Sequence, residues 1–180
     1  MSLGRHYSAT AKSLHWLIAL AVLSQFVVAL LMPDIGRRTQ PGPLIDLHFS
    51  LGVAILVLTV LRFANRLVDP VPLDDRDSLE WERTAARTMH LAFYFILLVS
   101  PLLGWASASA HRLPVTVFGV FTLPALAAPR ARWALLAGDI HSVTMWVLLA
   151  LVVLHAAAAL YHHMVRRDAV LRRMLPLSLE

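Results

Sequence analysis

The sequence predicts an all-α membrane protein, a single domain in which four transmembrane helices form a bundle. Two properties of the 180-residue chain point to it: 58% of the residues are apolar and only 15% are charged. In a soluble domain of this length about a quarter of all residues are usually charged, so the low charged fraction indicates a lipid environment. None of the apolar stretches alternates with period two, which excludes the strands of a membrane β-barrel.

Four apolar stretches predict the spans, at residues 14–32, 47–63, 89–110 and 140–161. Each is close to the roughly 20 residues that a helix needs to cross a hydrocarbon core of about 30 Å. Another uncharged stretch, 113–129, is broken by prolines and a glycine into pieces too short to cross as one helix. We expect it to form an interfacial or re-entrant cap between the third and fourth spans.

The basic residues predict the orientation. Of the 16 Lys and Arg residues, five lie on the loops of one side and the remaining eleven on the other. Positive residues concentrate on the cytoplasmic side of a membrane, so we expect both termini in the cytoplasm. The outer five are Arg37, Arg38, Arg112, Arg130 and Arg132; the inner eleven are Arg5, Lys12, Arg62, Arg66, Arg76, Arg83, Arg87, Arg166, Arg167, Arg172 and Arg173.

The composition also excludes several classes of site. The chain has no cysteine, which excludes disulfides, thiolate metal ligands, iron–sulfur clusters and the covalent attachment of c-type haem. The net charge of +5 does not indicate nucleic-acid binding, because the arginines sit at helix ends and form no basic stripe with interleaved aromatic residues. A metal or haem would therefore be held by His, Met or carboxylate side chains.

Histidines occur at two depths of the predicted bundle. His15 begins the first span near the inner surface, and His48 begins the second span near the outer surface. His141 lies at the outer end of the fourth span, and His155 follows it by fourteen residues. At a rise of about 1.5 Å and a turn of about 100° per residue, these two lie roughly 21 Å apart and within about 40° of the same face. His90 begins the third span and is again inner.

Two histidines from facing helices at each of two depths predict two haem b sites, because two imidazoles fill both axial positions of a haem iron. The expected pairs are His48 with His141 and His15 with His155. His90 shares the inner depth and is an alternative partner for His155. A six-coordinate iron has no vacancy for oxygen chemistry, so the expected work is electron transfer.

Two other roles would also place histidines in membrane helices. A single buried imidazole in a membrane helix often bonds only a neighbouring hydroxyl or carbonyl, but four imidazoles in two matched layers favour a cofactor. A zinc ion would need ligands clustered at one depth with i, i+3 or i, i+4 spacing. Only His162 and His163 are that close in sequence, and they point to different faces.

Four short runs of sequence stand out around these histidines. They are KSLHW at 12–16, DLHFSLG at 46–52, HAAAALYHH at 155–163 and LRRMLP at 171–176. Together they resemble the bacterial cytochrome b561 family, and the resemblance extends over nearly the whole chain. It implies a protein of the bacterial inner membrane with two haem b groups, whose axial pairs by matching position are His15/His155 and His48/His141.

Within that family the chain is most similar to the superoxide:ubiquinone oxidoreductases. The resemblance implies that superoxide gives its electron to the outer haem and that the inner haem passes it to ubiquinone. The five outer arginines fit this role, because a cationic surface can raise the encounter rate of an anion by one or more orders of magnitude. Solvation of the loops explains the same arginines equally well.

His162 is the candidate catalytic residue. It follows His155 by seven residues on the same face of the helix. The family uses the first histidine of this pair to bond a quinone carbonyl and deliver a proton, and the resemblance carries that role to His162. We expect His163 to reach the lipid headgroups instead. Arg62 lies on the face of His48 near the inner site and is expected to bond a haem propionate; a plain cytoplasmic arginine is the alternative.

A second function fits the same sequence: an electron-transfer subunit that links a partner dehydrogenase or reductase to the quinone pool. Such a subunit would share the four helices and the two haems, with no small-molecule substrate at the outer face. It would reduce quinone only with its partner, whereas the oxidase would work alone with superoxide.

Overall fold

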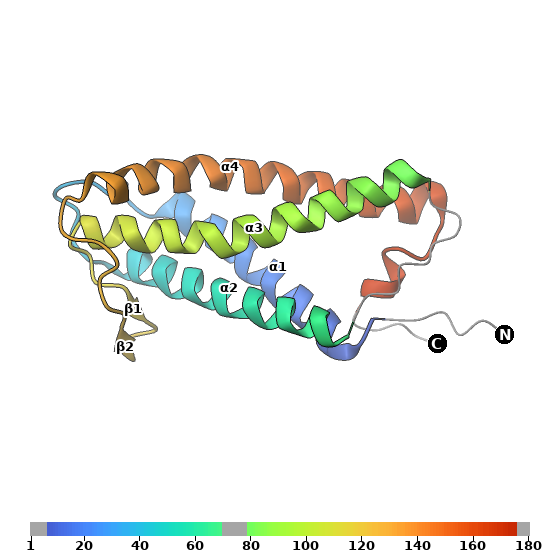
Figure 1. The fold of residues 1–180 in the computed structure, drawn as a ribbon, viewed down its shortest axis with the longest axis horizontal. Coiled ribbons are helices and arrows are strands. Elements are labelled where there is room, and N and C mark those ends of the chain that lie inside the picture. Colours follow the sequence, from blue (N-terminus) through green and yellow to red (C-terminus); the bar gives the residue numbers. More distant parts are fainter. Residues whose placement is uncertain (1–6, 70–78, 176–180) are drawn as a thin grey trace.

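The computed structural model describes residues 7–69 and 79–175 of the chain. Four long helices run alongside one another: α1 (Ala9–Leu31), α2 (Pro43–Val68), α3 (Glu80–Ala110) and α4 (Arg132–Tyr161) (Figure 1). Each contains a stretch long and apolar enough to cross a membrane. The predicted all-α membrane bundle of four helices is confirmed. Arg5 and Arg76 of the predicted inner set, and Pro176 of the last motif, lie outside the described residues.

Two of the helices start earlier than predicted, and polar residues make up most of the added start of α3. α3 starts at Glu80 and α4 at Arg132, well before the spans predicted from hydropathy. The Glu82 carboxylate accepts a hydrogen bond of 3.0 Å from the Leu79 N–H, which satisfies one of the free donors at the start of α3. Hydropathy detects only the part of a helix that crosses the hydrocarbon core, so it places these helix starts too late.

One buried apolar layer closes the middle of the bundle, and all four helices contribute to it. Its members are Ile18, Val22, Ile55, Ile96 and Leu148. α1 packs chiefly on α2, and α3 packs chiefly on α4. The α3–α4 contact requires small residues, because a Cβ atom on Gly138 would collide with the Ser107 side chain.

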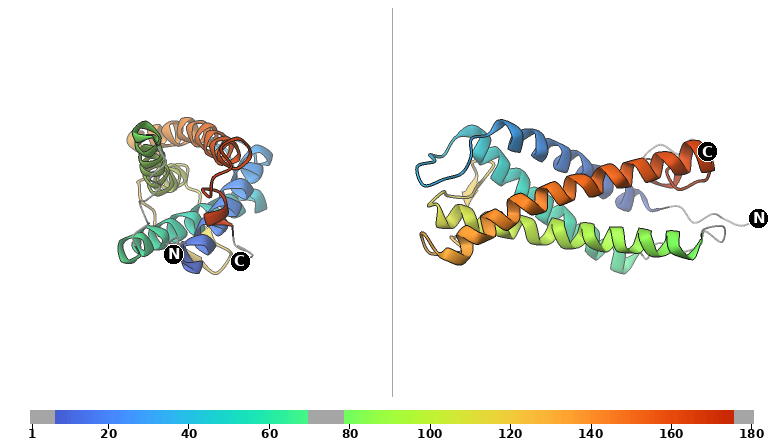
Figure 2. Two further views of the ribbon diagram at one scale, coloured as in Figure 1. Left: turned by 90° about the vertical axis from the view of Figure 1, so that its right-hand side faces the viewer. Right: turned by 90° about the horizontal axis from the view of Figure 1, so that it is seen from above.

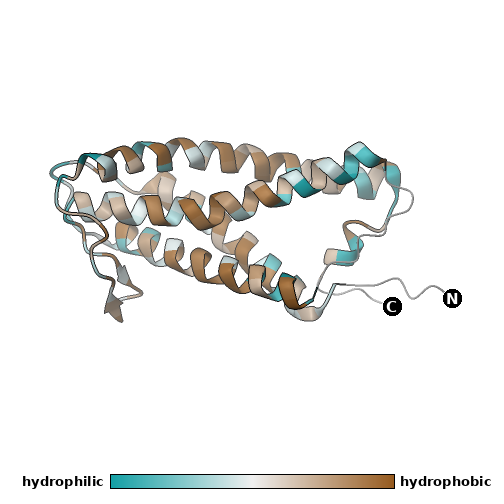
Figure 3. Ribbon diagram, viewed as in Figure 1, coloured by the Kyte–Doolittle hydropathy of each residue, from teal (hydrophilic) through white to brown (hydrophobic). Residues whose placement is uncertain are grey.

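The outward faces of the helices are apolar. Leu20, Leu30, Leu91, Val143 and Trp146 are between 64% and 73% exposed. Figure 3 shows hydrophobic residues along the middle of the bundle and hydrophilic residues concentrated toward its ends. Soluble monomers rarely expose contiguous apolar patches larger than a few hundred Å². Lipid is therefore the solvent that these faces require.

The segment between α3 and α4 contains two short antiparallel strands, β1 (Thr116–Val117) and β2 (Phe121–Thr122). This hairpin lies at one end of the bundle (Figure 1), which we call the hairpin end. It is anchored on α2, because the Phe118 N–H donates to the Ser50 hydroxyl oxygen at 2.9 Å. Residues 113–129 contain no fifth spanning helix, and an interfacial position for them stays a prediction.

The chain after α4 returns to the bundle at the opposite end, which we call the tail end. A π-helical turn, η1 (His162–Arg166), follows α4, and a 3-10 turn, η2 (Arg172–Met174), comes after it. The Trp16 indole N–H donates to the Met174 carbonyl at 2.7 Å, and Arg166 pairs with Glu82 at 2.7 Å. The starts of α1 and α3 and the end of α4 therefore lie at the same end of the bundle (Figure 2). A cytoplasmic location of this end stays a prediction.

Candidate haem sites

The first histidine pair, His48 on α2 and His141 on α4, meets in the hairpin half of the bundle. We call it the outer site, after its predicted side. The two ring centres lie 6.1 Å apart, and the ring planes cross at 85°. Both residues line a cavity of about 700 Å³ with walls from all four helices. Cofactor pockets typically measure about 300–1,000 Å³, so the cavity has a suitable volume.

The spacing of the two rings matches a pair of axial ligands. A histidine nitrogen binds a transition metal at roughly 2.0 Å, and the ring centre lies about 1.1 Å behind that nitrogen. Two imidazoles on opposite sides of one iron therefore place their ring centres roughly 6 Å apart. The outer pair has this separation without any further movement of the helices.

Ser100 on α3 orients His141. The Ser100 hydroxyl and carbonyl oxygens each lie 2.9 Å from His141 Nδ1, and Ser100 is only 1% exposed. Because Nδ1 is occupied, Nε2 is the nitrogen left to bind a metal, an arrangement typical of metal-bound histidines. Gly104 lets the ring approach α3 closely, since a Cβ atom there would lie 3.2 Å from His141 Cε1.

Gln25 on α1 completes the outer site. Its Nε2 donates to the His48 carbonyl at 3.0 Å. Among the described residues, Gln25 Oε1 and His48 Nδ1 are buried polar atoms without a hydrogen-bond partner. An unsatisfied buried polar atom costs about 1–3 kcal/mol, and both residues line the cavity. These unpartnered atoms, the ring spacing and the cavity volume all fit a bound haem.

The second site, called the inner site, brings together three histidines rather than two. The ring centre of His155 on α4 lies 6.3 Å from that of His15 on α1 and 6.1 Å from that of His90 on α3. Either separation fits two axial ligands on one iron. The structure therefore gathers the predicted inner residues and makes His15 and His90 equivalent by distance as partners of His155.

Apolar side chains separate the two sites. On α4, Leu148 lies midway between His141 and His155 and belongs to the buried layer at the middle of the bundle. The intervening length of helix corresponds to roughly 21 Å. One site therefore faces the hairpin end and the other faces the tail end.

Arg62 is already engaged beside the inner site. Its Nη1 donates to the Ala11 carbonyl at 2.8 Å, which ties the end of α2 to the start of α1. The guanidinium is still near enough to act electrostatically on His15, His90 and His155. Its other N–H groups remain donors, so a contact with a haem propionate stays a prediction.

His162 lies at the junction of α4 and η1, and its ring has a partner that was not predicted. Its Nδ1 lies 2.5 Å from Oδ2 of Asp168. The sequence gives no signal for Asp168, because the two residues meet only when the turn after α4 closes. The roles of Ser100 and Gln25 were missed for a related reason: each depends on a contact between two helices.

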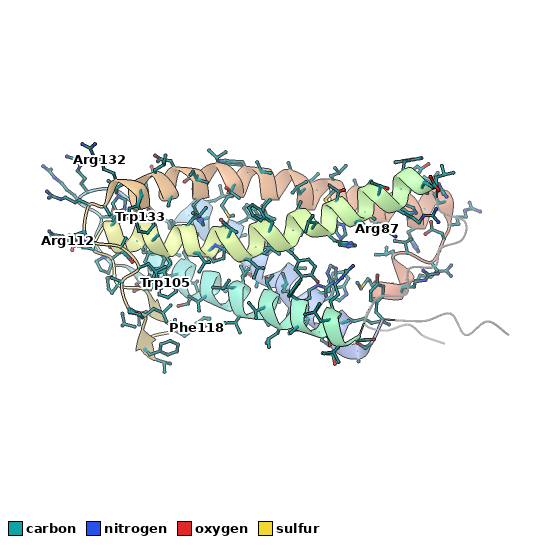
Figure 4. The ribbon with its side chains drawn as sticks, in the orientation of Figure 1. Arg87, Trp105, Arg112, Phe118, Arg132 and Trp133 are labelled. Atoms are coloured by element: carbon teal, nitrogen blue, oxygen red, sulfur yellow. The ribbon has the colours of Figure 1, made fainter. Side chains whose placement is uncertain are left out.

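The five predicted outer arginines are all exposed. In Figure 4, Arg112 and Arg132 lie at the hairpin end of the bundle, and Arg87 lies in the opposite half. Arg112 and Arg130 have φ angles of 63° and 62°, a left-handed conformation in the loops that flank the hairpin segment. The aspartates of the same loops and helix ends are Asp34, Asp46 and Asp139. The arginines outnumber them, so this end is cationic.

Comparisons with known proteins cover nearly the whole chain. A family model for prokaryotic cytochrome b561 matches residues 6–177. The chain is 32% identical over 172 residues to cytochrome b561 homolog 2 of Escherichia coli (strain K12), which covers 94% of this chain and 90% of that protein. It is 28% identical to the probable superoxide oxidase CybB of Yersinia pestis, over 96% of this chain and 97% of that protein. It is also 28% identical to cytochrome b562 of Cereibacter sphaeroides, over 94% of each.

These matches agree with the architecture. Four apolar helices and histidine pairs at haem-ligand spacing are what a membrane cytochrome b needs, and the relatives align with nearly the full length of the chain. The resemblance noted from the sequence motifs is confirmed. The chain belongs to the prokaryotic cytochrome b561 family of membrane proteins, which transfer electrons through haem b.

Proposed function

We propose that this protein is a superoxide:ubiquinone oxidoreductase of the bacterial inner membrane. In this proposal a single domain of four spans holds two b haems, superoxide is oxidised at the hairpin end, and ubiquinone is reduced at the tail end. One observation carries the proposal: two sets of imidazoles with axial-ligand spacing lie at two depths of one bundle, each toward a different end.

Four histidines would hold the haems. His48 and His141 would ligate the outer iron, and His15 and His155 the inner iron, with His90 as the alternative to His15. When bound, haem supplies one-electron transfer. With two histidines holding each haem, the site would favour electron transfer over oxygen binding. A layer of buried apolar side chains lies between the two sites.

The hairpin end would attract the reductant. Superoxide is an anion, and the five exposed arginines give this end an excess of positive charge over its aspartates. Such a surface concentrates anions and raises their encounter rate. The relative whose name is probable superoxide oxidase supports this choice of substrate, at 28% identity.

The tail end would bind the oxidant. His162 is half-buried on the α4 face that carries His155, so its imidazole can bond a quinone carbonyl and transfer a proton to it. The overall reaction balances when two superoxide ions each lose one electron and leave as dioxygen. One ubiquinone then gains two electrons and two protons and becomes ubiquinol.

The alternative is an electron-transfer subunit that serves a partner dehydrogenase or reductase. The same exposed arginines would then bind an acidic surface of the partner protein instead of a small anion. Two relatives whose names are cytochromes, without an oxidase activity in the name, fit this alternative equally.

The test is rapid mixing of purified, haem-loaded protein with superoxide, followed at the Soret band. Reduction of the haems that superoxide dismutase abolishes, followed by reoxidation on adding ubiquinone, is the expected result. Haems that superoxide leaves oxidised, and that only a partner protein can reduce, would identify the subunit instead.

A further inference from the structure

The chain closes on itself directly after α4. The π-helical turn His162–Arg166 is followed by Arg167, which has a φ of 54°. The Asp168 N–H then donates to the His162 carbonyl at 3.2 Å. Short π-helical segments occur frequently at functional sites. Here the turn brings residue 168 back beside residue 162.

The closed turn places a carboxylate on the imidazole. Asp168 Oδ2 lies 2.5 Å from His162 Nδ1, and Asp168 Oδ1 accepts a second bond of 3.1 Å from the Val170 N–H. The side chains of His162 and Asp168 are 22% and 31% exposed, so water reaches the pair only in part. Both oxygens are engaged, which fixes the carboxylate relative to the ring.

The charge state of Asp168 suits it to accept a hydrogen bond from a protonated ring nitrogen. Partial burial pushes the pKa of Asp168 upward, but the bonds from His162 and the Val170 N–H, and the charges of His162 and Arg166, outweigh burial and hold that pKa below its ordinary value. The carboxylate is therefore ionised at neutral pH. An ionised carboxylate can only accept, so Nδ1 of His162 must carry a proton.

We propose that Asp168 is a positioning residue for quinone reduction: it fixes the Nδ1–H tautomer of His162 and leaves Nε2 as the one nitrogen that exchanges a proton with the quinone. This inference rests on the proposed role of His162. Nε2 first takes up a proton from water at the tail end, which makes the ring an imidazolium, and then gives that proton to a quinone oxygen, which returns His162 to the neutral Nδ1–H form; the electrons are those that superoxide supplies. A carboxylate that orients a proton-transferring imidazole in this way also stabilises it when it is protonated.

A purely structural role for the pair is the competing explanation, and the chain offers a matched control. Glu82 makes a second ion pair that holds this segment, at 2.7 Å from Arg166, and within the described part of the chain it bonds Arg166 and the Leu79 N–H rather than His162. Glu82→Gln therefore loosens the same segment without touching the imidazole. Asp168→Asn removes the charge but keeps the shape, and Asp168→Glu retains a carboxylate.

The experiment uses full-length, haem-loaded protein reduced beforehand and mixed with a short-chain ubiquinone. Asp168→Asn should slow haem reoxidation at saturating quinone by about 10- to 100-fold, with little change in KM, as expected for loss of an oriented proton donor. Asp168→Glu should restore most of the rate, and Glu82→Gln should stay within about twofold of the unmodified protein. Equal slowing by Asp168→Asn and Glu82→Gln would overturn the positioning role.

A second measurement does not depend on turnover. Nitrogen NMR of protein labelled at histidine, with His162 assigned by comparison with His162→Ala, should show the Nδ1–H form, and Asp168→Asn should shift the population toward Nε2–H. An unchanged tautomer in Asp168→Asn contradicts the inference. If His162→Ala reoxidises with quinone at the normal rate, the proposed quinone role of His162 fails, and the tautomer measurement still decides whether Asp168 orients the ring.

Discussion

Ser100 on α3 bonds His141 on α4 twice, since its hydroxyl and carbonyl oxygens each lie 2.9 Å from the same Nδ1 atom. Two acceptors from one buried residue fix both the position and the tautomer of this imidazole. Groups behind a metal-bound histidine typically contribute about 10- to 100-fold to affinity. Ser100 is therefore a determinant of the outer site that no single helix reveals.

Ser100→Ala should weaken the outer site without destroying it. The carbonyl contact survives, so the loss of haem affinity should be at the lower end of that range, about tenfold. Haem titration of the purified apoprotein checks this. Thr144→Val is the matched control on α4, because the Thr144 hydroxyl donates to the Ile140 carbonyl of its own helix and, among the described residues, reaches no other helix. Equal losses in the two variants would show that Ser100 acts only through helix packing.

The chain should bind two b haems, and each should depend on one half of α4. Acid acetone should release both, because the sequence has no cysteine for covalent attachment. His141→Ala should remove only the outer haem and His155→Ala only the inner one, since the two residues belong to separate sites. Pyridine haemochrome analysis gives the stoichiometry. One haem per unmodified chain, or loss of the same spectral species in both variants, would refute the two-site arrangement.

The ring distances alone do not decide whether His15 or His90 is the second ligand of the inner site. His15 and His90 lie 6.3 Å and 6.1 Å from His155 between ring centres, and the family resemblance assigns the ligand role to His15. His90→Ala should therefore keep both haems, whereas His15→Ala should lose the inner one. Optical spectra of the two purified variants decide the matter. The reverse pattern would make His90 the ligand and would show that this chain departs from the family pairing.

Electron entry at the hairpin end should depend on charge. Reversing Arg37, Arg38, Arg130 and Arg132 to Glu should slow haem reduction by superoxide by about tenfold or more, because steering of an anion then turns into repulsion. Added salt should weaken the reaction of the unmodified protein, since screening limits the field to about 8 Å at physiological ionic strength. Stopped-flow reduction by superoxide measures both effects.

Two controls belong with that experiment. Reduction by a neutral quinol should be nearly unchanged in the reversed protein, and Arg87→Glu, a reversal in the opposite half of the bundle, should leave superoxide reduction unaffected. If neither the charge reversal nor added salt changes the rate of haem reduction by superoxide, the electrostatic argument for this substrate fails.

The closed turn after α4 should open in acid. The pKa of Asp168 is held below its ordinary value of 3.8 by its partners, against the opposing effect of burial. A lowered pKa in the folded state means that the pair stabilises the turn above about pH 4 and loses this contribution as the pH falls through the lowered value. Hydrogen exchange at the Val170 amide, corrected for the intrinsic rate, should show protection lost only below that point. Asp168→Asn should lack this acid step; an identical step in the variant would assign it to another group.

The sequence by itself determined the number of spans and the depth of each histidine. A stretch of about 20 apolar residues in lipid forms a helix, because each backbone N–H and C=O group must find its hydrogen-bond partner within the segment. Along one helix the geometry is rigid, so the relation of His141 to His155, and of His155 to His162, follows from residue spacing alone. That is why both histidine layers could be predicted, and why residues 113–129 could be separated from the spans by their prolines.

Only the tertiary structure decided what meets across helices. The rotation and axial shift of one helix against another depend on side-chain packing along the whole interface, and residue spacing does not encode them. The Ser100–His141 contact, the Gln25 bond to the His48 carbonyl and the equal approach of His15 and His90 to His155 all depend on those two quantities. The His162–Asp168 pair likewise required the closed turn after α4, since in an extended chain or a continued helix these residues would not touch.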